Sequence, residues 1–233
     1  MRVRPPRWTR PGPAGAGPGR AAVLAGLAAA VAGALLLGSP APYGRDPVGS
    51  AGTVPGAAAP SPAVPSSPAL PAAAPPVSLT LPGRFTAPVE AVAADAGGAL
   101  RLPESPRRLG WWALGGTPGA GRGTVLLAGH VDVRGAGPGV FAALREVPLG
   151  TYADVTTADG ERHRYVITAR RVHRREALPG DLFGSGGAAR LALVTCTGRW
   201  RPETGGYEEN LVLYGVPLPS ARRPGDGPGG TAS

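Results

Sequence analysis

The side chains best suited to covalent chemistry are a single cysteine and one of three histidines. Cys196 ends the apolar run LALVTC, and His130 ends the apolar run TVLLAGH; each precedes a loop of small and polar residues. A strand end gives a reactive group a rigid mount with an open approach. A thiol and an imidazole that face each other form a nucleophile and its acid/base partner in acyl transfer. The alternative for Cys196 is a buried, inert core cysteine.

Charged residues near these two positions suit the same chemistry. Arg199 and Arg201 follow Cys196 closely and would favour its thiolate form. Asp132 lies two residues after His130, so in an extended chain both side chains share one face. Asp132 either orients the imidazole, as a third group often does, or caps the loop that follows.

Other classes of site have little support. One cysteine excludes a disulfide within the chain, and one cysteine with three scattered histidines does not suit a structural zinc site. We expect His163 and His173, which lie among charged residues, to be solvated. We therefore expect no structural zinc site.

The elements that must position these side chains are mostly strands. Short apolar or alternating runs are separated by turns, and Asp159-Gly160 is a strong hairpin signal. Few segments favour a helix; one short helical turn is expected at 140–145. The pattern predicts a mostly-β barrel or sandwich over residues 77–218, with strands near 78–81, 87–92, 124–128, 152–156, 161–169, 191–195 and 211–216.

The flanks differ from this domain in composition. Residues 1–20 carry five arginines and no acid, over half of the formal net charge of +9, and are expected to form a disordered cytoplasmic tail. Residues 21–38 are uncharged and apolar and would span about 27 Å as a helix. This predicts a single-pass membrane anchor with the domain outside the cytoplasm; a cleaved signal peptide is the alternative. Residues 39–76 predict a disordered Pro/Ala-rich linker, and 219–233 a disordered tail.

The basic charge is not clustered within the domain, so it does not indicate nucleic-acid binding.

The segments TVLLAGHVDVRGAGPGVFAALREV (124–147) and LALVTCTGRWRPETGGYEENLVLYG (191–215) resemble the sortases, specifically the class F sortases of high-GC Gram-positive bacteria. The resemblance implies an eight-stranded β-barrel with short helices and no cofactor. It also implies a cysteine transpeptidase that cleaves an LPxTG-like sorting signal between Thr and Gly. The acyl group then passes to an amine of a cell-wall precursor or protein, or to water.

The same resemblance implies the roles of individual residues. Cys196 would be the nucleophile, and His130 would protonate the leaving amine and deprotonate the incoming one. Sortases place an arginine near the start of the last strand, but this chain has Tyr207-Glu208-Glu209-Asn210 there. We therefore expect Arg199, with Arg201 next, to support the oxyanion, and Asn210 to secure the junction between loop and strand.

Two other functions remain open from the sequence. L,D-transpeptidases also pair cysteine with histidine, but they place the histidine just before the cysteine, and no histidine precedes Cys196 closely. A cell-surface β-domain that has lost catalysis and binds peptide or wall material is the second alternative. The missing arginine near the last strand is its support.

Overall fold

The computed structural model describes residues 49–56, 74–95 and 98–219 of the 233-residue chain. The predicted cytoplasmic tail at 1–20 and the predicted membrane helix at 21–38 lie outside these residues. Most of the predicted linker and nearly all of the C-terminal tail do so as well. Among the residues that are described, no helix is long and apolar enough to cross a bilayer.

Eight strands form a closed barrel, which confirms the prediction of a mostly-β, eight-stranded fold with few helices. The order is β9-β11-β10-β5-β4-β3-β2-β8, and β8 pairs back to β9. The pairs β3–β4 and β5–β10 are parallel, and the other pairs are antiparallel. The strands are β2 (Pro76–Leu81), β3 (Phe85–Val92), β4 (Leu109–Trp112), β5 (Thr124–Ala128), β8 (Tyr152–Thr157), β9 (Arg162–Arg174), β10 (Arg190–Arg201) and β11 (Gly206–Pro217).

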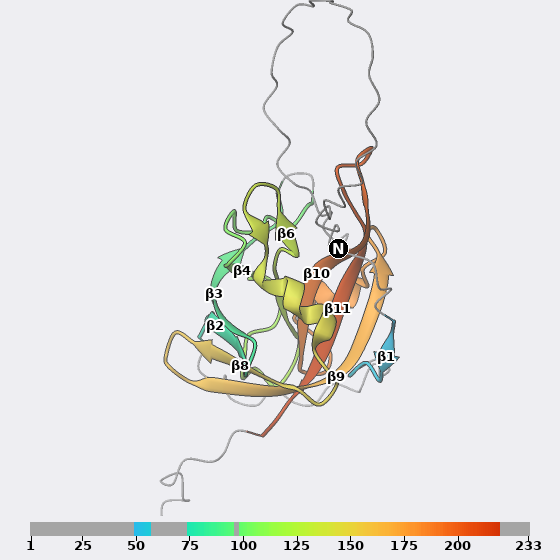
Figure 1. Ribbon diagram of the computed structural model, residues 1–233. Coiled ribbons are helices and arrows are strands. Elements are labelled where there is room, and N and C mark those ends of the chain that lie inside the picture. Colours follow the sequence, from blue (N-terminus) through green and yellow to red (C-terminus); the bar gives the residue numbers. More distant parts are fainter. Residues whose placement is uncertain (1–48, 57–73, 96–97, 220–233) are drawn as a thin grey trace, which may run out of the picture.

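Smaller elements decorate the barrel. The strand β1 (Ala51–Gly52) pairs with β9, and β6 (Asp132–Val133) and β7 (Gly137–Pro138) form a two-stranded hairpin. Two 3-10 helices, η1 (Val140–Glu146) and η2 (Gly180–Phe183), follow β7 and β9 along the chain. Figure 1 shows β9, β10 and β11 as long neighbouring strands, with β1 at the outer edge of β9.

Apolar side chains pack on both faces of the central strands. In β10, Leu191 and Leu193 join the main core, whereas Ala192 and Val194 join a second cluster that includes Trp112 and side chains of η2. A strand that is buried on both faces needs an unbroken apolar sequence rather than an alternating one. This requirement explains the run LALV, which ends two residues before the predicted nucleophile.

A segment within the predicted linker packs against the barrel. Residues 49–56 place β1 antiparallel to the edge of β9. The Arg171 guanidinium donates to the carbonyl oxygens of Ala51 (2.6 Å) and Gly52 (2.5 Å), and Arg190 donates to Pro55 O (3.1 Å). Val54 packs on the second apolar cluster. The folded unit therefore includes residues upstream of 77, the predicted start of the domain.

Gly52 tests this docking, because its backbone has φ of 78° and a Cβ there would lie 2.1 Å from the carbonyl oxygen of Thr168. Within a 49–219 fragment, we expect Gly52→Ala to lower the free energy of unfolding by more than about 1 kcal/mol. Gly49→Ala is the matched control, since a Cβ at Gly49 meets nothing within 4 Å. Urea denaturation measures both variants; equal stability would contradict a docked segment.

Candidate active site

The parallel pairing of β5 and β10 sets the relative positions of the two predicted reactive residues. The register pairs Ala128 with Val194, the last matched positions of the two strands. His130 and Cys196 each lie two residues further on. Neighbouring strands lie about 4.8 Å apart, and parallel strands end at the same edge of a sheet. The register therefore brings His130 and Cys196 to the same level on adjacent chain segments.

Two hydrogen bonds extend this alignment to the residues just before the reactive pair. The backbone N–H of Gly129 donates to the carbonyl of Val194 (3.1 Å). The Thr195 hydroxyl donates to the carbonyl of Gly129 (2.8 Å), and Thr195 is only 1% exposed. A buried carbonyl that loses its donor costs about 1–3 kcal/mol. The chains leading into His130 and Cys196 are therefore tied to each other directly.

A backbone carbonyl holds the half-buried His130 ring. Nε2 lies 2.8 Å from the carbonyl oxygen of Pro103, in the segment between β3 and β4. A carbonyl only accepts hydrogen bonds, so Nε2 must carry the hydrogen, and in the neutral ring Nδ1 carries the lone pair. Gly139 packs against the backbone of His130, since a Cβ there would lie 2.0 Å from the His130 carbonyl oxygen. While this bond lasts, a proton that the ring gains or loses must therefore move at Nδ1.

Cys196 lies at the boundary between core and surface. It is partly exposed, whereas Val194 and Thr195 before it are almost fully buried. On the neighbouring β11 it pairs with Asn210, which is 1% exposed. The Asn210 side chain donates to the carbonyl of Arg175 (3.3 Å), so it holds the chain beyond β9 against β11.

A bulge follows Cys196 and changes the direction of the arginines. Gly198 and Arg199 together face the single residue Glu208, and Gly198 has φ of 77°. Such bulges re-aim side chains. Arg199 is exposed and forms no ion pair with another described residue. Arg201, in contrast, is paired with Glu208 at the start of β11.

Asp132 has a partner that the sequence did not reveal. Its carboxylate accepts a hydrogen bond from the hydroxyl of Tyr207 in β11. The Tyr207 ring also contacts Trp200 edge-on, with ring centroids 5.3 Å apart. The contact joins the hairpin that follows His130 to the hairpin that follows Cys196.

His173 differs from its expected solvated state. It pairs with Asn210 in the sheet, so Cys196, Asn210 and His173 occupy one row across β10, β11 and β9. Its Nε2 is buried and has no hydrogen-bond partner among the described residues. Burial lowers the pKa of this imidazole, and the charge of Arg171 lowers it further, against a smaller opposite effect of Asp181. The reason is that β9 continues to Arg174, beyond the expected end at residue 169.

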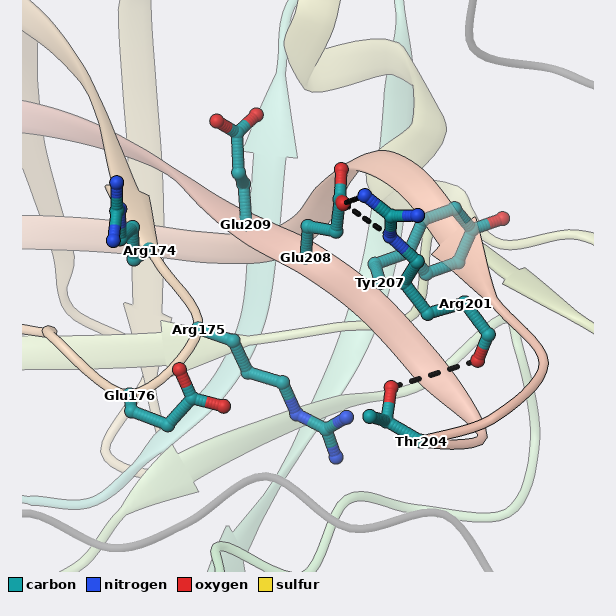
Figure 2. A pocket seen from close by; sticks show the side chains of 8 residues that line it. All are labelled: Arg174, Arg175, Glu176, Arg201, Thr204, Tyr207, Glu208 and Glu209. Carbon is teal, nitrogen blue, oxygen red and sulfur yellow. Dashed lines mark hydrogen bonds and ion pairs between the residues drawn. The ribbon is translucent and has the colours of Figure 1, made fainter.

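A pocket of about 400 Å³ lies beyond Cys196, between the end of β9 and the β10–β11 hairpin. Figure 2 shows the paired Arg201 and Glu208 on one wall and Arg175 extending towards Thr204. Neither Cys196 nor His130 lines the pocket, so it does not contain the two predicted reactive residues. Its lining is Arg174, Arg175, Glu176, Arg201, Thr204, Tyr207, Glu208 and Glu209. In the described part of the chain, no group of three or more His, Cys, Asp or Glu could hold a metal ion.

Comparisons with known proteins give the family of the chain through one family model. No curated protein sequence matches the chain. Among solved structures, sortase C1 of Streptococcus agalactiae, in its complex with MTSET, shares 21% identity, with 62% of this chain and 69% of that one covered and a TM-score of 0.47. Sortase A of Corynebacterium diphtheriae shares 19% identity, covering 66% of this chain and 65% of that one, with a TM-score of 0.46. The family model of the sortase domain matches residues 85–218. Because this match spans more than half of the sequence, the chain belongs to the sortase family.

Proposed function

We propose that this sortase acts as a class F enzyme that cleaves an LPxTG-like sorting signal between Thr and Gly and transfers the acyl group to an amine. Cys196 is the nucleophile and His130 is the general acid and base. The observation that best supports these roles is the parallel register of β5 and β10, which brings the two residues to adjacent strand exits. The likeness of residues 124–147 and 191–215 to class F sequences supports the subclass.

The first half of the reaction forms a thioester. The Cys196 thiolate attacks the carbonyl carbon of the signal's threonine and gives a tetrahedral oxyanion. The carbon–nitrogen bond to glycine then breaks, and the leaving amine takes a proton from Nδ1 of His130. Meanwhile Nε2 keeps its hydrogen and continues to donate it to the Pro103 carbonyl (2.8 Å), so the ring does not need to turn.

The second half reverses the proton transfer. An acceptor amine attacks the thioester carbon, and Nδ1 of His130 takes the proton that the amine loses. The carbon–sulfur bond breaks, the new amide leaves, and Cys196 returns as the thiolate. Water in place of the amine gives hydrolysis. A well-placed acid/base group contributes about 100- to 10,000-fold to such steps.

Arg199 supports the oxyanion in this proposal. The bulge gives its exposed side chain a direction that an uninterrupted strand would not, while Glu208 holds Arg201. Asn210 has a supporting role, since it fixes the β11 position beside Cys196.

The cellular location in this proposal follows from the sequence outside the described residues: 21–38 anchors the chain once in the cell membrane, with the catalytic domain extracytoplasmic. Surface proteins with sorting signals are the substrates, and amines of cell-wall precursors or proteins are the acceptors.

The central test is cleavage of LPxTG-like peptides by a 49–219 fragment, followed by mass spectrometry of the enzyme. We expect a thioacyl adduct on Cys196 in the unaltered protein. Cys196→Ala should abolish cleavage, and His130→Ala should reduce it by about 100-fold or more. His163→Ala is the control, because it changes an imidazole that lies on β9 and not at the exits of β5 and β10. Cleavage retained by Cys196→Ala would exclude the nucleophile, and a thiol that alkylates only on unfolding would favour a catalytically inactive binding domain.

A second test separates the two arginines. We expect Arg199→Ala to lower kcat for peptide cleavage by at least about tenfold, because losing one oxyanion donor typically costs about 100- to 1000-fold. Arg201→Ala should have a smaller effect on kcat, since the guanidinium it removes is already engaged by Glu208. Steady-state kinetics of both variants provides the comparison. If neither loses tenfold, backbone N–H groups rather than an arginine stabilise the oxyanion.

A further inference from the structure

The residues after His130 form a small hairpin of their own. Asp132 pairs with Pro138 between β6 and β7, and Gly139 N–H donates to Val131 O (2.9 Å). His130 lies at the base of this hairpin. The position of its ring therefore depends on what holds the hairpin, as well as on the Pro103 carbonyl.

Tyr207 holds the hairpin from the other side of the site. It pairs with Trp200 across β10 and β11, and the two rings meet at an interplanar angle of 77°. Trp200 is four residues after Cys196 on the same strand. The ring of Tyr207 is thus fixed to the Cys196 strand, while its hydroxyl donates to Asp132 beside His130.

This hydrogen bond closes a loop of contacts around the reactive pair. The backbone link between β5 and β10 ends at Gly129 and Val194, and Thr195 adds one side-chain bond. All of these lie before the reactive residues. The Tyr207–Asp132 bond joins the two chain segments after those residues. A hydroxyl that donates to a carboxylate makes one of the stronger and more directional hydrogen bonds in proteins.

We propose that Tyr207, acting through Asp132, positions the His130 imidazole for proton transfer at Cys196. Tyr207 is a positioning residue and does not itself exchange a proton with the substrate. The proposal rests on the proposed acyl transfer, and it assigns a role to a tyrosine to which the sequence analysis gave none. A displacement of about 1 Å in a reacting group can cost about 100-fold in rate.

The side chains of Tyr207 and Asp132 are only partly buried. Losing the hydrogen bond between them should therefore affect the position of His130 more than the stability of the fold. Tyr207→Phe deletes the hydroxyl but keeps the ring that contacts Trp200. The Asp132 carboxylate then has access to water as a replacement donor, so the barrel should retain its stability. The loss should appear in the geometry of the His130 hairpin and hence in proton transfer.

The experiment compares variants of the full chain for cleavage of the sorting peptide. We expect Tyr207→Phe to lower kcat about 10- to 100-fold with little change in KM, and to alter the pH profile of kcat. Asp132→Ala should reproduce this loss, and Asp132→Asn, whose amide oxygen still accepts from Tyr207, should restore part of it. The double variant Tyr207→Phe/Asp132→Ala should be no slower than either single variant. Tyr152→Phe, which changes an exposed ring on β8, is the control.

A substrate-free readout keeps this test separate from that of the acyl transfer. We expect the pH dependence of Cys196 alkylation by iodoacetamide in Tyr207→Phe to approach that in His130→Ala. Unchanged kcat and alkylation profiles in Tyr207→Phe, or losses that multiply in the double variant, would overturn the positioning role. If no peptide forms a thioester but the alkylation profiles shift as expected, the positioning holds and the proposed substrate is wrong.

Discussion

The parallel pairing of β5 and β10 is the constraint on which the site depends. Parallel strands end at the same edge of a sheet, so residues two positions beyond the shared register lie at the same level on adjacent chain segments. An antiparallel pairing of the same two sequences would place His130 and Cys196 at opposite edges. The pairing is held by apolar burial on both faces of β10 and by the buried bond from Thr195 to Gly129. The chemistry therefore depends on the packing of residues that take no part in it.

Charge on the β10–β11 hairpin is arranged differently from what the family pattern implies. Glu208 stands where an arginine is expected, and it engages Arg201 of the facing strand. The Arg201–Glu208 pair is only partly exposed, so the Arg201 guanidinium is held in place and is not available to bind an oxyanion. Arg199, which lies in the two-residue bulge, is the arginine nearest to Cys196 along the chain. Because Arg199 is exposed, ordering it against an oxyanion would cost side-chain entropy, and this chain should lose part of the benefit of a fixed donor.

Local pattern was enough for some features and not for others. The apolar runs before Cys196 and His130 predict strand ends because a strand that is buried on both faces needs consecutive apolar residues. The residue that donates to Asp132 and the carbonyl that accepts from the His130 ring could not be predicted, since Tyr207 and Pro103 are distant in sequence. The docking of residues 49–56 could not be predicted from apolar periodicity either, because hydrogen bonds from two arginines to backbone carbonyls hold this segment. His173 looked solvated because its neighbours are charged, yet the length of β9 buries its Nε2.

The fixed tautomer of His130 links these observations. In the proposed reaction the imidazole donates a proton in one half-reaction and accepts one in the next, so one nitrogen must face the substrate throughout. The Pro103 carbonyl provides this by occupying Nε2 with a bond that only a protonated nitrogen can make. A single hydrogen bond does not fix the plane of a ring, however. The Gly139 contact restrains the backbone, and the Tyr207–Asp132 bond restrains the hairpin beyond it. Three separate contacts, each from a different part of the chain, therefore restrain the His130 ring and the backbone around it.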